Sequence, residues 1–338
     1  MSISFNKPPV IVTGGAGFIG SHVVEQLLEL GRHVTVLDNF ESGRYENLAA
    51  VKGSERVKVV EADVTKKKEL EGIFQRGSCV IHLAGLADIV PSIQQPHRYY
   101  DVNVTGTLNV LQEAVSNGCT KFVYAASSTC YGIPDSFPTT EDQPLRPQYP
   151  YALTKNMGEQ LVMHWSMVYG LQAISLRLFN VYGPRVRTNG TYGAVLGIFR
   201  SQKANGYPLT IVGDGKQSRD FTHVSDVASA FALSIETPVT GHVLNVGSGT
   251  HRSVNDLARL IGGEKVHIPK RPGEPDITFA DISKASDLLN WRPRVELEAG
   301  VSDLLNSIHD WKSAPLWDQE SIAEATSDWF ELLGSENE

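Results

Sequence analysis

Short apolar runs alternate with amphipathic stretches along the first 180 or so residues of the chain. The apolar runs include "PVIVTG", "HVTVLDN", "VKVVEAD", "CVIHLAG" and "KFVYAASS", and amphipathic stretches such as "HVVEQLLELG" and "VTGTLNVLQEAVSNG" lie between them. Strands that alternate with helices in this way indicate a parallel sheet with right-handed crossovers. The pattern predicts an α/β fold with a doubly wound parallel sheet.

The regular alternation of apolar runs and amphipathic stretches ends after residue 180, where Gly and Pro become more frequent in segments such as "VYGPRVRTNGTYG" and "IPKRPGEPD". We expect a first domain over 1–180 and a smaller α/β C-terminal substrate domain over 181–338. A helix that starts near Val224 belongs to a segment, near 218–240, that we expect to return to the first domain, although its packing partner is open.

The last amphipathic segment, "SIAEATSDWFELLG", predicts one helix near the C-terminus. Ser321 is its expected N-cap, with Glu324 at the capping-box position and Gly334 as the stop.

Composition and charge exclude several classes of protein. Of 338 residues, 41% are hydrophobic and 20% are charged, the balance of a globular protein. The net charge is -8 and the longest basic run is "KKK", which argues against a nucleic-acid partner. Three cysteines without close pairs favour the reducing cytoplasm over a disulfide or thiolate metal site. We expect neither an export signal nor a membrane span.

A glycine-rich turn follows the first predicted strand. In "VIVTGGAGFIGSHV", Gly14, Gly17 and Gly20 come between a strand and a helix, where backbone can approach a pyrophosphate. Asp38 ends the next strand, and its carboxylate would accept from adenosine ribose hydroxyls and repel a 2'-phosphate, favouring NAD over NADP. The alternative is a tight turn with a strand-capping Asp. Asp63 fits either the adenine site or a solvated turn.

Tyr151 and Lys155 lie four residues apart on a predicted helix and therefore share a face. A Lys ammonium and a cationic nicotinamide would both lower the pKa of the Tyr hydroxyl and make it a general base. Taken alone, the pair fits a core aromatic and a solvated Lys better, because this pairing is common by chance at helical spacing.

The order of several motifs changes this interpretation. "TGGAGFIG", Asp38, "HLAG", "NVTGT", "SS", "YALTK", "RLFNVYGPR", "SRDFTHVSDV" and "RPGEPDITFADISKA" occur in this order over nearly the whole chain. Together they resemble the nucleotide-sugar epimerase and dehydratase branch of the extended short-chain dehydrogenase/reductase family. The resemblance implies a Rossmann-type NAD-binding domain at 1–180 and a nucleotide-sugar-binding domain at 181–338. It implies that NAD contacts Gly14, Gly17, Phe18, Ile19, Gly20, Asp38, Asn39, Asp63, Val64, Leu83, Ala84, Asn103, Tyr151 and Lys155.

The same resemblance implies that Ser127, Tyr151 and Lys155 are catalytic. Ser127 would bind the substrate 4-oxygen beside Tyr151, and Lys155 would also reach the nicotinamide ribose. Arg219 and Arg271 would clamp the nucleotide phosphates, as guanidinium groups do well. The implied substrate-binding set is Ser127, Ser128, Thr129, Asn180, Tyr192, Arg219, Arg271 and Thr278.

Local interactions are alternatives for several of these side chains. Arg219 could pair with Asp220 or another surface acid, and Arg271 could serve only its Pro-rich loop. Ser128 and Thr129 could satisfy only nearby backbone groups. His82 has no partner at metal-ligand spacing, so we expect a buried, hydrogen-bonded histidine and no metal.

The reaction follows from the residues after Ser127. The dehydratases and decarboxylases resembled here carry acidic residues at this place, whereas this chain has Ser128 and Thr129. A hydroxyl cannot replace a carboxylate as the base for elimination. We therefore expect C4 epimerisation of a UDP-hexose through a 4-keto intermediate. The small Thr278, and "NGTYGAV" at 189–195, add UDP-N-acetylglucosamine and UDP-N-acetylgalactosamine as candidate substrates.

Other readings stay open at this point. They are 4,6-dehydration, C2 or C3/C5 epimerisation, reduction of a keto sugar, and a non-catalytic NAD-binding interaction protein. The resemblance implies a homodimer formed through the helix near 98–117 and the helix of Tyr151. The apolar segments "LNVLQEAV" and "MGEQLVMHW" permit this, but each could equally cover the sheet of its own subunit.

Overall fold

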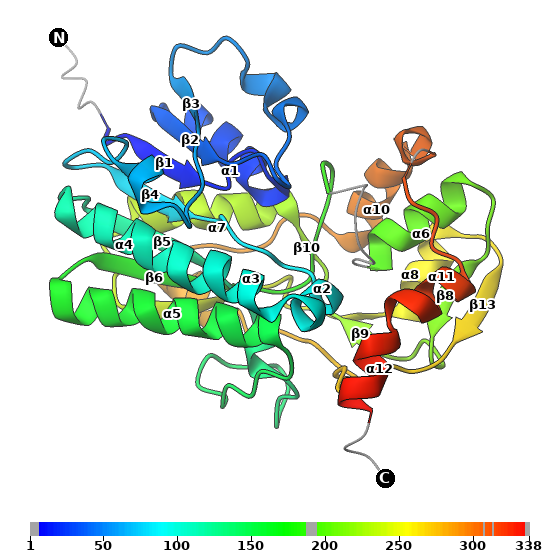
Figure 1. Ribbon diagram of the computed structural model, residues 1–338. Coiled ribbons are helices and arrows are strands. Elements are labelled where there is room, and N and C mark those ends of the chain that lie inside the picture. Colours follow the sequence, from blue (N-terminus) through cyan, green and yellow to red (C-terminus); the bar gives the residue numbers. More distant parts are fainter. Residues whose placement is uncertain (1–6, 187–194, 307, 313, 335–338) are drawn as a thin grey trace.

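A seven-stranded parallel sheet forms the centre of the protein. The structure is a computed structural model that describes residues 7–186, 195–306, 308–312 and 314–334 (Figure 1). The strands are β1 (Val10–Thr13), β2 (Val34–Asp38), β3 (Val57–Glu61), β4 (Cys79–His82), β5 (Lys121–Ser127), β6 (Gln172–Leu178) and β11 (His242–Val246). They lie in the order β3-β2-β1-β4-β5-β6-β11, and every neighbouring pair is parallel. The strand order reverses at β1, next to β4, which confirms the predicted doubly wound α/β fold.

Helices cover both faces of this sheet. One face carries α1 (Phe18–Glu29) and α7 (Val224–Glu236), whose apolar side chains share a core with β1 and β11. The other face carries α4 (Gly106–Ser116) and α5 (Pro150–Tyr169), which lie side by side in front of the sheet (Figure 1). The chain therefore returns to the main sheet through α7 and β11, and α7 begins at Val224 as expected. The division into domains at residue 180 stays a prediction.

The two segments expected at a dimer face mostly cover their own sheet. Val110 and Leu111 of α4 and Val162 of α5 are fully buried in the core under this face. Helix α4 continues from α3 (Pro96–Tyr100) through a π-helical turn over Asp101–Thr105. These apolar residues are thus used within the subunit, and an interface would need other side chains.

A second region lies beside the sheet (Figure 1). It is built from α6 (Val195–Ala204), β8 (Leu209–Val212), α8 (Val254–Ile261), β13 (Lys265–Ile268) and α10 (Leu297–Asn306), with β8 and β13 paired in parallel. Its own apolar core includes Phe199, Ile211 and Leu257. Short elements connect the regions: α2 (Ile89–Gln94), β7 (Val181–Tyr182), β9 (Ser218–Arg219), β10 (Thr222–His223), β12 (Arg252–Ser253) and α9 (Ser283–Leu289). Among the described residues, no helix is long and apolar enough to cross a membrane.

The expected C-terminal helix is two helices, which corrects the sequence-based expectation. They are α11 (Gln319–Ala325) and α12 (Ser327–Leu333), separated at Thr326. Asp318, and not Ser321, is the N-cap: its carboxylate accepts from the Ser321 backbone N–H at 2.9 Å, while the Ser321 hydroxyl accepts from the Asp318 N–H at 3.0 Å. Asp is as good an N-cap as Ser, so the capping box forms one turn earlier.

Candidate active site

One cavity of about 620 Å³ runs from the carboxyl ends of the central strands into the second region. It lies at the point where the strand order reverses, the usual ligand site of a doubly wound sheet. Most of the side chains expected to bind cofactor or substrate line it. They are Gly14, Gly17, Phe18, Ile19, Gly20, Asp38, Asn39, Asp63, Val64, Leu83, Ala84, Ser127, Ser128, Thr129, Tyr151, Lys155, Asn180, Arg219 and Arg271.

The glycine turn after β1 is fixed by close backbone packing. Gly14 has a φ of 68°, and a Cβ there would lie 2.7 Å from the Ala84 nitrogen. A Cβ on Gly20 would lie 2.1 Å from the Gly14 carbonyl oxygen. Helix α1 begins after Gly17 without a side-chain cap or an acidic residue in its first turn. Its N–H groups therefore form an uncapped cradle that fits the pyrophosphate of a dinucleotide.

Asp38 serves the turn as well as the cavity. Its carboxylate accepts from the Ala16 N–H and from the Phe40 N–H, both at 2.9 Å. Burial raises the pKa of this carboxyl, while the two backbone hydrogen bonds oppose that shift. Each carboxylate oxygen keeps acceptor capacity, so binding to ribose hydroxyls and the strand-end role are compatible.

Two other expected cofactor residues are held by local contacts. Asp63 lines the cavity, and its carboxylate accepts from the Thr65 N–H and hydroxyl at 2.9 and 2.8 Å. Asn103 is 1% exposed and lies behind the cavity wall. Its side chain exchanges hydrogen bonds with the Leu86 backbone and donates to Thr154 on α5 at 3.0 Å. Asn103 thus fixes the loop after β4 against α5, and its contact with the cofactor stays a prediction.

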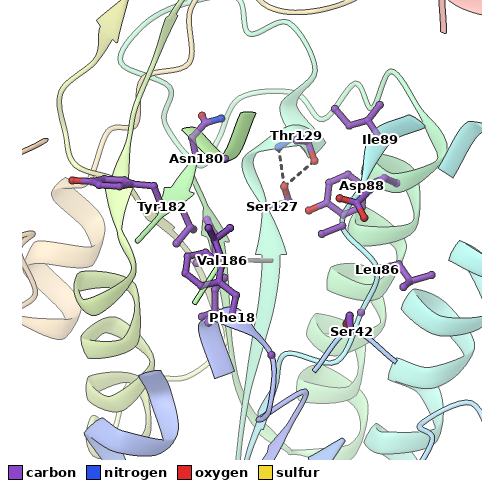
Figure 2. Close-up of a pocket in the computed structure, with 18 of the residues that line it drawn as sticks. Phe18, Ser42, Leu86, Asp88, Ile89, Ser127, Thr129, Asn180, Tyr182 and Val186 are labelled. Carbon is purple, nitrogen blue, oxygen red and sulfur yellow. Dashed lines mark hydrogen bonds between the residues drawn. The ribbon is translucent and has the colours of Figure 1, made fainter. Parts of the chain in front are cut away.

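Ser127, Thr129 and Tyr151 form the polar centre of the cavity. The Ser127 hydroxyl lies 2.8 Å from the Thr129 hydroxyl and accepts from the Thr129 N–H at 3.2 Å (Figure 2). Burial raises the pKa of Tyr151 to about 12, while hydrogen bonds from Ser127 and Thr129 lower it. The protein alone therefore raises this pKa, whereas the sequence analysis expected it to be lowered, because the effect of burial is larger than that of the two hydroxyl contacts. A cationic nicotinamide beside the ring would supply the opposing charge.

Lys155 lies one turn after Tyr151 on α5 and is 6% exposed. Its ammonium group donates to the Ala125 carbonyl at 2.9 Å and lies 5.2 Å from the centre of the Tyr124 ring. Burial lowers the pKa of Lys155 to about 8. Tyr151 and Lys155 both line the cavity, so the solvated-lysine alternative does not hold for Lys155.

The far end of the cavity carries two arginines and a shared carboxylate. Arg219 is ion-paired with Glu274 at 2.7 Å, and Arg271 lies 3.8 Å from the other Glu274 oxygen. The Arg271 guanidinium also lies 5.6 Å from the centre of the Trp329 ring of α12. The sequence analysis left open which acidic residue pairs with Arg219, and in the structure this residue is Glu274. Arg219, Arg271, Glu274 and Trp329 all line the cavity. The two guanidinium groups therefore face the cavity together with the carboxylate that holds them.

Asn180 and Thr278 are joined to each other at this wall. The Thr278 hydroxyl donates to the Asn180 side-chain oxygen at 3.0 Å and accepts from the Asp220 N–H at 3.2 Å. Asn180 lines the cavity, whereas Thr278 lies behind it. Tyr192 lies outside the described residues, as does most of "NGTYGAV".

His82 is the buried, hydrogen-bonded histidine expected from the sequence. Its ring nitrogens lie 2.7 Å from the Thr13 hydroxyl and 2.9 Å from the Thr107 hydroxyl. Burial lowers its pKa to about 3, so the ring is neutral.

Among the cavity residues that the sequence analysis did not name are Asp88, Glu274 and Trp329. Asp88 follows "HLAG" at the end of β4, and strands next to the reversal point send their loops to the ligand, so its position was a usable signal. Glu274 stands three residues after Arg271. Trp329 gave no signal, because nothing in the sequence joins the C-terminal helix to the cavity.

Comparison with known proteins identifies relatives along most of the chain. The model of the "NAD dependent epimerase/dehydratase family" matches residues 10–247. A putative UDP-glucose 4-epimerase from Methanocaldococcus jannaschii is 35% identical over 88% of this chain and 97% of its own. A UDP-glucuronate 4-epimerase from Thermodesulfobacterium geofontis is 37% identical over 88% of this chain and 94% of its own.

Solved structures show the same fold. The crystal structure of UDP-glucose 4-epimerase from Thermotoga maritima, determined with UDP-glucose, has a TM-score of 0.82 at 34% identity over 89% of this chain and 99% of that chain. Decarboxylases of UDP-linked uronates and a dTDP-glucose 4,6-dehydratase are also among the relatives and neighbours. The similarity therefore extends over enzymes that perform different reactions on nucleotide sugars.

Proposed function

Because the chain belongs to the NAD-dependent epimerase/dehydratase family, with NAD as its cofactor, we propose that it is a UDP-hexose 4-epimerase. One observation carries the proposal: Tyr151 and Lys155 share a cavity with the hydroxyls of Ser127, Ser128 and Thr129. Relatives named for 4-epimerisation at 35% and 37% identity support the same reaction.

Tyr151 is the proton acceptor in this proposal. Its tyrosinate oxygen takes the proton from the sugar 4-hydroxyl and becomes the neutral phenol, and Ser127 orients the 4-oxygen by a hydrogen bond. NAD, when bound at the glycine turn and Asp38, would supply the acceptor and donor of the C4 hydride. Lys155, held by the Ala125 carbonyl, would hold the ribose and adds positive charge that favours tyrosinate.

Arg219 and Arg271 hold the nucleotide while the sugar turns. Guanidinium groups bind phosphate oxygens in a bidentate manner, so the diphosphate stays anchored during rotation of the keto sugar. In the described structure Glu274 contacts both arginines. A diphosphate entering this end of the cavity would compete with that carboxylate.

The turn after Ser127 favours epimerisation over elimination. Ser128 and Thr129 bring hydroxyls to the cavity at the place where a dehydratase carries acidic residues. The Thr129 side chain already contacts the hydroxyls of Ser127 and Tyr151 by hydrogen bonds. Neither hydroxyl is a base strong enough to remove a proton from C5.

The test is interconversion of nucleotide sugars by the purified, NAD-loaded protein. UDP-glucose, UDP-galactose and their 2-acetamido counterparts are incubated separately, and the anomeric protons are followed by NMR. We expect each member of a converted pair to reach the same equilibrium mixture from either side. If no pair is interconverted although NAD is bound, the proposal is wrong.

A second candidate is 4,6-dehydration, favoured by one observation. Asp88 brings a carboxylate to the cavity that holds Tyr151. One carboxylate could serve as the base at C5, but protonation of the departing 6-hydroxyl needs a further acid. A 4-keto-6-deoxy product, detected by its absorbance in alkali, would favour this reaction over epimerisation.

We also propose a homodimer in the cytoplasm. The outer surface of α3 and α5 exposes Tyr100, Leu153, Met167 and Val168, with exposed fractions of 46%, 47%, 76% and 54%. The described cysteines are free and buried, which fits a reducing compartment. Light scattering of the purified chain and of Leu153→Glu checks the assembly: the variant should shift toward monomer.

A further inference from the structure

A buried chain of polar side chains runs behind the described wall of the cavity. It consists of Glu159 on α5, Arg177 on β6, Tyr131 and Asn245 on β11, all of them buried. The Arg177 guanidinium donates from Nε and Nη2 to the Glu159 carboxylate at 3.1 and 2.6 Å, and from Nη1 to the Tyr131 hydroxyl at 2.9 Å. The Tyr131 hydroxyl in turn donates to the Asn245 side-chain oxygen at 2.7 Å. One guanidinium group therefore links α5 to Tyr131.

The Glu159 end of this chain belongs to the helix that carries the proposed base. Glu159 comes eight residues after Tyr151 and four after Lys155, so the three side chains share one face of α5. The helix continues without a break over Pro150–Tyr169. The contact between Glu159 and Arg177 therefore also sets where Tyr151 lies.

The Tyr131 end belongs to the turn that brings hydroxyls to the same place. Tyr131 is the last residue of the 3-10 turn Ser128–Tyr131, which begins directly after Ser127 and contains Thr129. The guanidinium carbon of Arg177 lies 4.8 Å from the centre of the Tyr131 ring, so the turn is held by its ring as well as by its hydroxyl. The group that holds α5 thus also holds this turn.

Stability alone is a weak explanation for a buried ion pair. The desolvation of two charges offsets much of their attraction, and a well-packed apolar pair is often as stable. The pair is nevertheless well hydrogen-bonded: Ser175 donates to Glu159 at 2.9 Å, and Arg177 donates to the Glu141 carbonyl at 3.1 Å. A planar guanidinium that holds a carboxylate and a hydroxyl at once fixes the direction of both.

The geometry that this chain controls is the contact of Tyr151 with the two neighbouring hydroxyls. Burial raises the pKa of Tyr151, and hydrogen bonds from Ser127 and Thr129 oppose that rise. Cys130 of the same turn and Asp88 before α2 also act on Tyr151, and both raise its pKa. Because the hydroxyls lie at the turn and the phenol lies on α5, the link between turn and helix sets how strongly these hydrogen bonds act.

We propose that Tyr131, Arg177 and Glu159 are positioning residues for the reaction. They hold the turn and α5 together, so that the hydroxyls beside Tyr151 stay within hydrogen-bonding distance of it. The assignment rests on the proposed function, because that function makes Tyr151 the base. It deepens the function by naming residues that act on the base from behind the cavity wall.

The experiment removes one hydroxyl from the chain. Tyr131→Phe keeps the ring but takes away the group between Arg177 and Asn245. The matched control, Ser175→Ala, also removes one buried hydroxyl, which bonds Glu159 but leaves the link to Tyr131 in place. Denaturation midpoints are measured for both variants, so that a general loss of stability is seen separately.

The first readout is the titration of Tyr151 in the NAD-loaded protein, without any sugar. Tyrosinate absorbance is recorded for each protein and for the same protein carrying Tyr151→Phe, and the difference isolates this residue. Tyr131→Phe should raise the pKa of Tyr151 by about half a pH unit or more, the equivalent of one weakened hydrogen bond. Ser175→Ala should leave this pKa unchanged.

The second readout is kcat as a function of pH, with UDP-glucose and UDP-galactose as probes. In Tyr131→Phe the acid side of the profile should move to higher pH, with kcat there reduced about threefold or more, because less tyrosinate is present. KM and NAD content should not change. An equal loss of kcat at every pH, with the profile in place, would indicate a purely structural role and overturn the assignment.

A second variant keeps the test decisive. Arg177→Lys retains the positive charge, but an ammonium group cannot reproduce the fork that holds Glu159 and Tyr131 together, so the Tyr151 pKa should rise at least as far. An unchanged titration in the folded variants, or an equal shift in Ser175→Ala, overturns the assignment. Failure of both Tyr131→Phe and Arg177→Lys to fold also overturns it, since the chain would then serve stability. If the titration shifts as expected but no sugar is converted by wild type, the epimerase proposal fails and the positioning role stands.

Discussion

The two ends of the cavity are built in different ways. At the cofactor end, close backbone contacts fix the turn from Gly14 to Gly20, both within its own strand–helix unit and with Ala84 after β4. At the end proposed for the nucleotide sugar, side chains from distant segments line the wall, including Arg219, Arg271 and Trp329. On the proposed assignment, the first end would bind a cofactor shared by the family, whereas the second could vary with the substrate because its side chains are replaceable one at a time.

The largest expected effect comes from the residue where the two ends meet. Tyr151→Phe should reduce turnover by about a thousandfold, the middle of the range for a lost general base, because phenylalanine has no oxygen to accept the proton where Ser127 and Thr129 contact the Tyr151 hydroxyl. NAD content after purification should not change. Tyr100→Phe, on an exposed ring, is the matched control. Turnover retained in Tyr151→Phe would remove this residue from its role.

One substitution in the glycine turn should disrupt the whole cofactor end of the cavity. Gly20→Ala places a Cβ 2.1 Å from the Gly14 carbonyl oxygen, so backbone must move, at a cost of about 3 kcal/mol in the free energy of unfolding. We expect loss of bound NAD and a lower denaturation midpoint. Gly197→Ala is the control: its Cβ would lie 3.6 Å from Trp311 and should stabilise α6 by up to about 1 kcal/mol. Equal midpoints for the two variants would contradict this account of the turn.

Lys155 makes stability depend on pH. Burial lowers its pKa to about 8 from an ordinary value of 10.5, so between these values the unfolded chain binds a proton that the folded chain has released. The free energy of unfolding should therefore rise as the pH rises through this window. Lys155→Met should remove most of that rise, which denaturant unfolding from pH about 8 to 10 measures. A slope of equal size in the variant would show that Lys155 is not its source.

The smallest effect is expected at the nucleotide-sugar end. Trp329→Leu removes the ring beside Arg271 and should weaken UDP binding about tenfold, or about 1.4 kcal/mol, without changing NAD content. Trp165→Leu, on α5 outside the cavity wall, is the control. Calorimetry with UDP distinguishes them, and equal affinities would place Trp329 outside the binding of nucleotide.

What the sequence could predict follows the same division. The glycine turn and the position of Lys155 belong to short local motifs, so their ordered resemblance to a known family was enough to place them in one cavity. Asp88 and Trp329 act through chain segments that meet only after folding, and the sequence does not encode that meeting in any short pattern. The predicted start of the C-terminal helix was wrong for a simpler reason. Both Asp318 and Ser321 are good N-caps, and only the folded geometry selects between them.

The contact between Trp329 and Arg271 has a practical consequence. Trp329 is 3% exposed, its indole N–H donates to the Pro272 carbonyl at 2.9 Å, and its ring faces a guanidinium assigned to phosphate. An indole is a natural fluorophore whose emission depends on nearby charge. If Arg271 binds phosphate as proposed, a nucleotide that draws it away would change that emission, so the C-terminal helix would supply an optical signal for occupancy, with Trp329→Leu as the spectral blank.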